Sequence, residues 1–454
     1  MDYTRTLAEF CSGITLESLP EEVVEKAKLC VLDFIANVYG SCKLEAVRGV
    51  VDRFRRVAGP GEAPVLACGF STTVRDAAFL NGTMAEAIEA QDGLRFGGNH
   101  PVSAVMPAAF AVAQERGRSG RELIEAVVAG YEMANRVAAS VHPFHTFSGF
   151  LPTGTCGTFG AAAAAARLRG LDAPGMLNAL GVAGYLVPLS MAEQLMGGCT
   201  VKIVQGGQAA HAGITAVDLA EAGLSGHPRV LEGSELKGGF TQITVKAEPV
   251  CERLTEGLGE RYTISDVYFK PYTACRHTHG AAQATCALVD ELGLRADQVD
   301  SIVIHTYGIA TVAVGKGLGE NPTFVAAQFS VPFVVAACLL EGRMGPDQLT
   351  DEFISRTDVA DLMGRTTVVM DEELNAVYPE KTSSRVEVTL KDGTVLSRQV
   401  DIPRGDPRDP MRLEDIAGKL EAFAGERGKE LNRVVELVED LQSVDDIALL
   451  TSLI

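Results

Sequence analysis

The stretch GFLPTGTCGTFGAAAAAA, residues 149–166, decides the fold class of this chain. Its six consecutive alanines favour a helix, because alanine has the highest intrinsic helix propensity of the amino acids. Glycine and alanine carry little or no side chain, so neighbouring helices approach such a segment closely. The stretch therefore predicts a helix that packs tightly inside a helical bundle.

Apolar residues recur at helical spacing on both sides of this stretch, from about residue 3 to about residue 225. The run Leu19-Pro20-Glu21-Glu22 is typical of a helix start. Further helices are expected over residues 73–90, 107–114, 120–141, 159–169, 174–186 and 208–222. The first half of the chain is therefore predicted to be helical throughout.

The pattern changes after Gly238. Residues 240–245 and 300–306 alternate in the manner of strands, and residues 384–402 predict a hairpin that turns at Lys391-Asp392-Gly393. Helical stretches at 280–292 and 326–340 lie between these strands. Residues from about 260 to about 400 are therefore predicted to form a separate α/β unit.

A turn-rich linker, residues 403–410, follows the predicted hairpin. Residues 413–450 then show a helical pattern again, with an apolar stripe. We expect this tail to rejoin the first, helical domain.

Composition and charge exclude some classes of protein. The chain has 454 residues, 46% hydrophobic and 22% charged, which is ordinary for a globular protein and excludes wholesale disorder. Its 40 Lys and Arg against 59 Asp and Glu give a net charge of −19, which argues against a general nucleic-acid binder. A small anionic substrate stays compatible with this charge, since it needs only a local basic pocket.

The sequence predicts neither a secretory signal nor a membrane span. Residues 1–10 have no continuous apolar core, and the strongest apolar runs, such as residues 333–340, are far shorter than a membrane helix. The ten cysteines are scattered and form no CxxC pair, as expected for reduced thiols. We expect a cytoplasmic protein without a membrane partner.

The segment KPYTACRHTH, residues 270–279, is the richest in reactive side chains. On an extended backbone His277 and His279 would share a face. This spacing also suits a zinc site, although no second pair of Cys or His residues is spaced to complete one. A cluster of solvated polar groups at a strand end is the plain alternative. We favour a cationic pocket wall, because Lys270 offers a point charge and Arg276 a bidentate fork to a carboxylate.

The segment EAQDGLRFGGNHPVS, residues 89–103, predicts a glycine-rich loop between two helices. It carries Glu89, Asp92, Arg95, Asn99 and His100. A histidine with an ordinary pKa near ~6.5 suits proton transfer at neutral pH. The alternative is a turn whose histidine is satisfied by the backbone.

Two more segments are candidates. At residues 149–160, glycines and threonines stand at a predicted helix start, where free backbone N–H groups favour an anion. Tight helix packing explains these residues equally well. The P-loop pattern is absent from this segment. Lys202 stands alone in the apolar, glycine-flanked run GGCTVKIVQGG, residues 197–207. It is either a carboxylate anchor, a base with a lowered pKa, or a snorkelling surface lysine.

Together these segments resemble the MmgE/PrpD family, which includes 2-methylcitrate dehydratase, cis-aconitate decarboxylase and iminodisuccinate epimerase. The resemblance runs through nearly the whole chain in order. Its landmarks are Leu19–Val23 with Lys28 and Asp33, Asp92 with His100-Pro101, Pro152–Gly157, Lys202, Lys270–His279, Ala327–Pro332 and Gly405–Pro410.

The resemblance implies a mainly α fold, in which an all-α main domain, residues 1–260 plus 404–454, carries an inserted smaller α/β (α+β) lid domain, residues 261–403. It also implies a homodimer and chemistry on di- or tricarboxylates without a metal or cofactor. Catalytic residues carried over by position are Asp92, His100, Lys202 and Lys270. Substrate-binding residues would be Thr153, Gly154, Arg276, His277 and His279.

The chain departs from the family pattern at three places. The Asp-rich stretch before the His-Pro pair reads Glu89-Ala90-Gln91-Asp92-Gly93, Leu151 stands where the family often has His, and the run after Lys202 lacks a His and an Arg. These losses argue against tricarboxylate specificity.

The leading hypothesis is a lyase that removes water from a hydroxy-carboxylate by abstraction of an α-proton, similar to 2-methylcitrate dehydratase. The alternative is an isomerase, epimerase or decarboxylase that works through the same carbanion-like intermediate. A third hypothesis is a binding or scaffold protein that has lost the chemistry. We expect Lys202→Ala to abolish activity and leave folding intact.

Overall fold

The computed structural model describes residues 2–320 and 322–454 and consists mainly of helices. The first part of the chain forms α1 (Tyr3–Gly13), α2 (Glu21–Ser41), α3 (Glu45–Val57), α4 (Val74–Ala87), α5 (Val102–Arg116), α6 (Gly120–Val141), α7 (Phe144–Phe147), α8 (Pro152–Leu168), α9 (Ala173–Leu186), α10 (Ala192–Met196), α11 (Gln205–Glu221) and α12 (Phe240–Ile243). A short hairpin, β1 (Ala63–Val65) and β2 (Phe70–Thr72), lies before α4. The prediction of a mainly α fold is confirmed.

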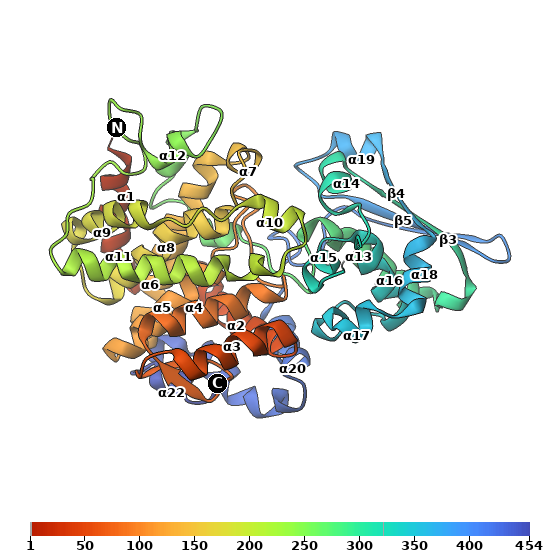
Figure 1. Cartoon of the computed structure of the whole chain (residues 1–454), viewed down its shortest axis with the longest axis horizontal. Helices are drawn as coiled ribbons and strands as arrows, with labels where there is room; N and C mark the ends of the chain where they lie inside the picture. The colour runs from red at the N-terminus through yellow and green to blue at the C-terminus, as the bar shows by residue number, and fades with distance from the viewer. Residues whose placement is uncertain (1, 321) are drawn as a thin grey trace.

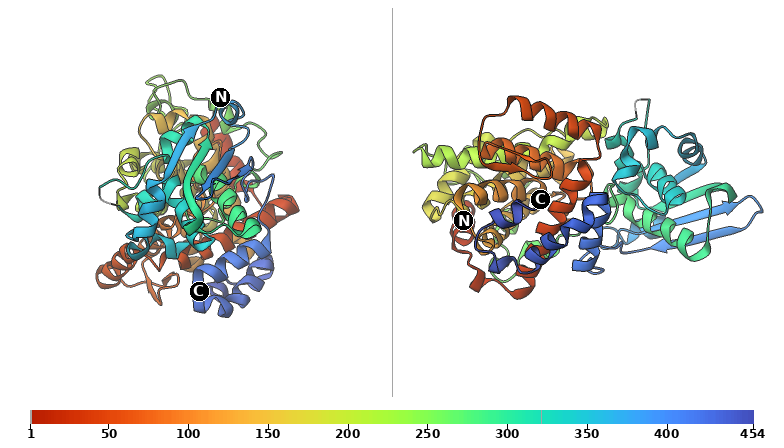
Figure 2. Two further views of the ribbon diagram at one scale, coloured as in Figure 1. Left: turned by 90° about the vertical axis from the view of Figure 1, so that its right-hand side faces the viewer. Right: turned by 90° about the horizontal axis from the view of Figure 1, so that it is seen from below.

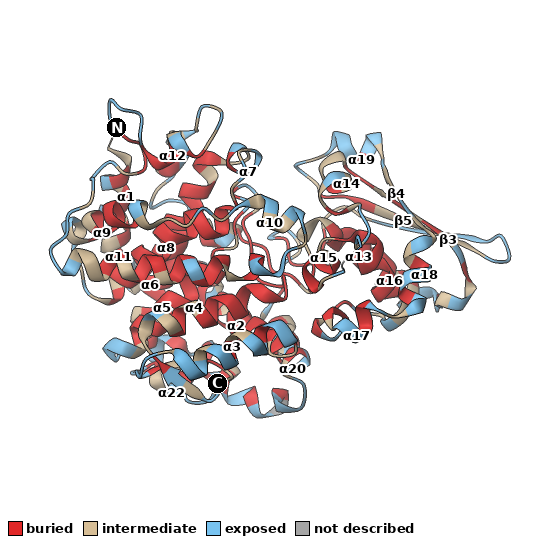
Figure 3. Ribbon diagram, in the orientation of Figure 1, coloured by how far each residue is buried: buried red, intermediate tan, exposed pale blue. Residues whose placement is uncertain are grey.

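Helix α8 lies at the centre of the helical core, between α5, α6, α9 and α11 (Figures 1 and 3). The whole alanine run Ala161–Ala166 is buried. A Cβ on Gly160 would lie 2.6 Å from the carbonyl oxygen of Gly130 on α6, so only glycine permits this approach. The helix starts at Pro152, seven residues before the predicted start, because proline fits the first turn of a helix.

The second part of the chain contains a four-stranded sheet of order β4-β3-β5-β6, from β3 (Val299–Thr306), β4 (Thr366–Met370), β5 (Ser384–Leu390) and β6 (Val395–Val400). Strand β3 pairs parallel with β4 and antiparallel with β5, with Ile304 opposite Val368 and Val386. The predicted hairpin is confirmed as β5 and β6. The accompanying helices are α13 (His279–Leu292), α14 (Gly308–Val314), α15 (Phe324–Gln328), α16 (Val331–Glu341), α17 (Asp351–Ile354), α18 (Thr357–Gly364) and α19 (Glu372–Ala376).

The tail forms α20 (Leu413–Ala424), α21 (Asn432–Glu439) and α22 (Ala448–Thr451) and returns to the first group of helices. Helix α20 packs against α2, where Lys419 Nζ donates to Asp33 Oδ1 at 2.6 Å. Figures 1 and 2 show the elements between α13 and β6 as a smaller group at one end of the molecule, beside the helical body. That this smaller group acts as a lid stays a prediction.

Residues 240–245 do not form the predicted strand. They contain α12, and the backbone N–H groups of Phe240 and Thr241 donate to the carbonyl oxygens of Val230 and Leu231. Both side chains are buried, so the segment does not have the one-sided burial of a strand. The strand prediction was wrong because a short alternating pattern does not specify a partner strand.

Candidate functional site

A cavity of about 540 Å³ lies between the helical body and the smaller group. The body contributes the loop after α4, the start of α8, α10 and the short helix η2 (Thr200–Val204). The other wall comes from residues 268–277, which include the start of η5 (Arg276–Thr278), and from α14 and α15. Residues distant in the sequence therefore meet around one cavity that is open to solvent on one side.

Glu89 is the centre of a buried ionic cluster on the cavity wall. Lys270 Nζ donates to Glu89 Oε1 at 2.8 Å, and Lys202 Nζ donates to Glu89 Oε2. Lys202 Nζ also donates to Glu86 Oε1 at 2.6 Å. The cluster thus matches two ammonium groups with two carboxylates, Glu86 and Glu89, which both come from the end of α4 and the loop after it.

The ion pairs favour the charged forms of Glu89 and Lys202. Burial opposes ionisation of Glu89, but Lys202 and Lys270 hold the pKa of its carboxyl well below the usual range. Burial also disfavours the Lys202 ammonium, but Glu86 and Glu89 raise the pKa of Lys202 above its ordinary value. Glu89 has a φ of +53°, in the left-handed region that non-glycine residues rarely adopt. Such strained backbone is concentrated at functional sites.

His100 lies beside this cluster with one ring nitrogen fixed and the other near Glu89. Its Nδ1 lies 2.6 Å from the carbonyl oxygen of Asp92, which only accepts, so Nδ1 carries the proton. Its Nε2 lies 3.6 Å from Glu89 Oε1. Burial and the charge of Lys270 lower the pKa of His100 to about 4, so the imidazole is neutral at pH 7. The ring is therefore a base whose Nε2 lone pair is available.

Thr153 holds the backbone of this base in place. Its Oγ1, in the first turn of α8, accepts a hydrogen bond of 2.9 Å from the backbone N–H of His100. Thr153 also lines the cavity, whereas Gly154 is buried behind it. A Cβ on Gly154 would lie 2.6 Å from the Ser190 Cβ, so glycine at this position permits close packing.

Asp92 is fully buried and does not line the cavity. Its Oδ2 accepts a hydrogen bond of 2.7 Å from the Tyr131 hydroxyl, and its Oδ1 accepts one of 3.2 Å from the Val102 N–H. Burial raises the pKa of Asp92 to about 7. The carbonyl group of Asp92, rather than its side chain, contacts His100.

Arg276 lines the cavity next to Tyr268. Its Nη1 donates to the carbonyl oxygens of Phe269 and Arg404, and its Nη2 donates to that of Pro403. Its guanidinium carbon lies 4.9 Å from the centroid of the Tyr268 ring. These three bonds leave two of its five N–H donors. Among the described residues Arg276 forms no ion pair, although the charge of Asp406, which also lines the cavity, acts on the guanidinium.

The two histidines of the 270–279 segment do not share an extended face. His277 lies in η5 and lines the cavity, with its Nδ1 2.6 Å from the Tyr307 hydroxyl. His279 begins α13, is fully buried, and donates from Nε2 to the carbonyl oxygen of Ala274 at 3.1 Å. The expectation of an extended backbone was wrong because a helical turn begins at Arg276.

The structure therefore brings five of the nine predicted site residues to the cavity: His100, Thr153, Lys202, Arg276 and His277. The other four, Asp92, Gly154, Lys270 and His279, lie behind its wall. The ammonium groups of Lys202 and Lys270 both form ion pairs with Glu89.

Sequence reasoning did not assign site roles to Glu86, Glu89, Tyr268 and Gln205. Gln205 Nε2 donates to Glu86 Oε1 at 2.6 Å, and Gln205, Glu89 and Tyr268 line the cavity. A signal was available, since Glu86 and Glu89 stand three residues apart in an otherwise apolar helix end, MAEAIEA. Two acidic side chains in a buried, otherwise apolar stretch require cationic partners.

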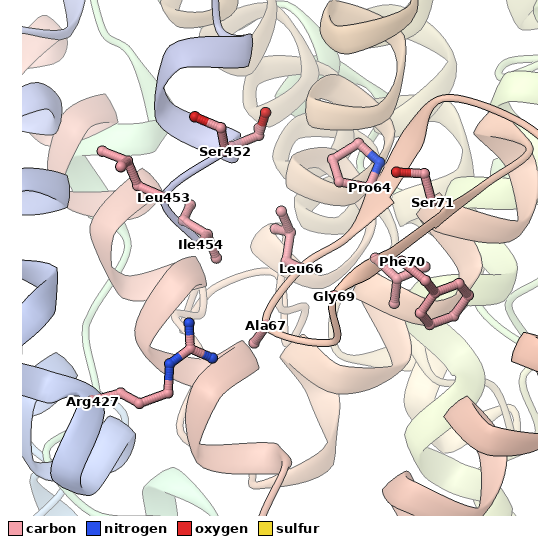
Figure 4. A pocket seen from close by; sticks show the side chains of 12 residues that line it. Pro64, Leu66, Ala67, Gly69, Phe70, Ser71, Arg427, Ser452, Leu453 and Ile454 are labelled. Carbon is pink, nitrogen blue, oxygen red and sulfur yellow. The ribbon is translucent and has the colours of Figure 1, made fainter.

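Other candidate features of the described residues do not match the predicted site. No group of three or more His, Cys, Asp or Glu side chains is arranged to hold a metal ion across residues 2–320 and 322–454. A second cavity, of about 410 Å³, lies between the β1–β2 hairpin and the last residues of the chain (Figure 4), away from every predicted site residue. Within the same described ranges, every helix is too short or too polar to cross a lipid bilayer.

Comparison with known proteins agrees with this architecture. Residues 5–252 match the family model of the MmgE/PrpD N-terminal domain, and residues 272–443 match that of the MmgE/PrpD C-terminal domain. Cis-aconitate decarboxylase from Aspergillus terreus is 29% identical over 478 residues, which cover 99% of this chain and 95% of that protein. The human cis-aconitate decarboxylase is 25% identical over 477 residues, covering 99% and 94%.

A shorter match is to the mitochondrial 2-methylcitrate dehydratase of Yarrowia lipolytica. That protein is 31% identical over 172 residues, which cover 36% of this chain and 32% of the dehydratase. The two family models together span most of the chain, from residue 5 to residue 443. This chain therefore belongs to the MmgE/PrpD family.

Proposed function

We propose that this chain is a lyase that acts on a small carboxylic acid by removing the proton α to a carboxylate, with water as the leaving group. The observation that carries the proposal is His100, a neutral imidazole fixed by Asp92 with its Nε2 facing Glu89 on the cavity wall. The family assignment supports it, because named relatives are a dehydratase and decarboxylases.

The substrate carboxylate binds Arg276. Arg276 lines the cavity, and three of its five N–H donors bind backbone carbonyl oxygens, which leaves two for a ligand. When the α-proton leaves, negative charge builds up on the carboxylate oxygens. A fixed guanidinium beside them stabilises that charge more strongly in the transition state than in the ground state.

His100 carries out both proton transfers. Its Nε2 takes the proton from the α-carbon, and the C–H electron pair forms the C=C bond as the C–O bond of the neighbouring carbon breaks. The resulting imidazolium is a strong acid, since the pKa of His100 is about 4, and it gives the same proton to the departing hydroxide to form water. The raised pKa of Lys202 makes that ammonium a hydrogen-bond donor to the hydroxyl group and not the proton source.

A second candidate is decarboxylation of a related carboxylate. The relatives named cis-aconitate decarboxylase match 99% of this chain, whereas the dehydratase from Yarrowia lipolytica matches 36%. In this reaction the C–C bond to the leaving CO₂ breaks with its electron pair left on carbon, and that carbon takes a proton from water, because His100 is neutral at pH 7. An isomerase or epimerase would use the same carbanion-like intermediate.

Four further expectations belong to this proposal; the first two derive from the family resemblance, and the last two from the charge and the cysteine pattern of the sequence. The chemistry needs no cofactor, because one imidazole and one guanidinium perform the steps described. The protein is a homodimer. It is located in the cytoplasm and has no nucleic-acid partner.

The test is proton NMR in D₂O with hydroxy- and unsaturated mono-, di- and tricarboxylates, for the wild-type protein and for His100→Gln. We expect one substrate class to lose water or CO₂, deuterium to enter carbon when D₂O adds back to the double bond or when a solvent proton replaces CO₂, and the rate to fall by roughly 10²- to 10⁴-fold in the variant. A folded wild-type protein that is silent across the panel contradicts the proposal and supports the non-catalytic alternative. Equal rates for the two proteins remove His100 from the mechanism.

A further inference from the structure

The cavity has an apolar wall in addition to the ionic cluster. Its apolar side chains come from α7, the residue before α8 and α10 in the helical body, and from α14 and the segments around α15 in the smaller group. Representative members are Phe147, Leu151, Met196, Val312, Leu318 and Phe329. Phe329 links the two regions, because Lys202 Nζ lies 5.6 Å from its ring centroid.

Several of these side chains are exposed although they line a concave surface. Phe147 is 66% exposed, Met196 57% and Val312 61%. Apolar surface in contact with water is unfavourable, by about 25 cal/mol per Å². Other residues of the described chain leave more than half of the surface of each of these three side chains exposed to water. An apolar group of a ligand would remove this area from water.

The charges on the cavity wall argue against a substrate with many carboxylates. Lys202 and Lys270 are matched by Glu86 and Glu89, so neither ammonium is free to balance a substrate carboxylate. Arg276, which is partly buried, forms no ion pair among the described residues, although Asp406, which also lines the cavity, lies near enough for its charge to oppose the lowering of the Arg276 pKa by burial. Arg95 and Lys316 also line the cavity, but they are partly or fully exposed, where water screens their attraction.

We propose that the substrate is a carboxylate that carries an apolar chain of several carbons. Its carboxylate binds Arg276 beside His100, and its chain lies along the apolar wall formed by α7, α10 and α14. This inference rests on the proposed function of the same cavity and names its substrate class. A volume of about 540 Å³ is in the range of pockets that enclose a whole small ligand.

The binding test uses isothermal titration calorimetry with acetate, butanoate, hexanoate and octanoate, and with citrate as the tricarboxylate probe. We expect Kd to fall by about fourfold for each added methylene until the wall is covered, since each buried CH₂ contributes about that factor. Citrate is expected to bind more weakly than octanoate. A Kd that is independent of chain length, or citrate binding tighter than octanoate, overturns the inference.

A pair of variants locates the apolar chain. Val312→Asp places a charge on the apolar wall, at an exposed position of α14 where the fold tolerates it. We expect it to weaken octanoate binding at least tenfold and to affect acetate much less. Val395→Asp is the matched control, because Val395 is also exposed but lies on β6, outside the cavity. Equal octanoate affinity in both variants overturns the assignment of this wall.

The binding and exchange measurements distinguish the two proposals. Deuterium exchange without any dependence of Kd on chain length overturns the inference and leaves the proposed function standing. A clear dependence on chain length, with no exchange or turnover for any carboxylate, supports the apolar subsite and contradicts the lyase.

Discussion

Lys270 contacts Glu89 twice, since its Nζ donates to the carboxylate Oε1 at 2.8 Å and to the backbone carbonyl oxygen at 3.1 Å. The two residues are 181 positions apart, Glu89 in the loop after α4 and Lys270 in the segment that leads into the smaller group. The contact explains how Glu89 keeps its left-handed backbone, because the same ammonium binds both its side chain and its main chain.

Removing the Lys270 ammonium should therefore destabilise the fold. We expect Lys270→Met to lower the free energy of unfolding by about 3–5 kcal/mol, because it leaves a buried carboxylate with one cation fewer. Urea denaturation measures the change. The control is Lys43→Met, which breaks a more exposed pair with Asp347 and should have a small effect. Equal losses in the two variants would show that the buried pair has no special role.

The structure changes the expectation for Lys202→Ala. The sequence predicted loss of activity with folding intact, but Lys202 is buried between Glu86 and Glu89. Without its charge these carboxylates repel each other, so we expect the variant to be both inactive and less stable. The double variant Lys202→Met with Glu89→Gln should recover much of the melting temperature and none of the activity. A stable single variant would contradict the buried cluster.

The acid limb of the pH profile reports on His100. A base must be neutral, and burial with Lys270 lowers the pKa of His100 to about 4. We expect kcat/KM to be half-maximal near pH 4 on the acid side, instead of near ~6.5 for an ordinary histidine. Glu89 raises the pKa of His100, so Glu89→Gln should move the limb to lower pH. A limb near pH 6.5 in the wild-type protein would contradict the lowered pKa of His100.

Gly93 shows how closely the site is packed. A Cβ at this position would overlap the Tyr268 hydroxyl and lie 2.9 Å from His100 Nδ1. Gly93→Ala should displace both rings and lower kcat/KM by about 100-fold, because small misplacements of catalytic groups are costly. Gly49→Ala on α3 is the control, since open space surrounds that position and activity should be unchanged. Identical kinetics for both variants would contradict the packing.

Much of the fold could be predicted from periodicity. Helix α6 has the predicted bounds, Gly120–Val141, because Ser119 and Glu122 form a capping box that marks its start. The β5–β6 hairpin was also found, since Asp392-Gly393 is a strong turn signal. The error at α12 arose because Phe240 and Thr241 satisfy their backbone N–H groups in a loop contact that no local pattern encodes.

The site was predicted only in part, for a different reason. Sequence reasoning singled out Lys202 in its apolar run and Lys270 as part of a cationic pocket wall. Which carboxylates they meet depends on how α4, η2 and the 268–277 segment come together. Charge pairing across more than a hundred residues has no periodic signature in the sequence. Glu89 was therefore noted in its loop without a role, although it contacts both lysines.

Asp92 should make stability depend on pH. Burial raises its folded pKa from 3.8 to about 7, so between about pH 4 and pH 7 the folded protein keeps a proton that the unfolded chain releases. The free energy of unfolding should therefore fall as the pH rises through this window, by about 4 kcal/mol from this group. Asp92→Asn, which stays neutral, should gain stability relative to wild type from pH 4 to pH 7.

Urea denaturation at pH 4.5, 6 and 7.5 measures this difference. Asp52→Asn serves as the control because Asp52 is exposed. The free energy of unfolding of this variant should follow that of the wild-type protein at each pH. A difference between Asp92→Asn and wild type that stays constant over the three pH values would mean that Asp92 is ionised throughout. The hydrogen bonds from Tyr131 and Val102 would then be sufficient to stabilise a buried carboxylate beside the base.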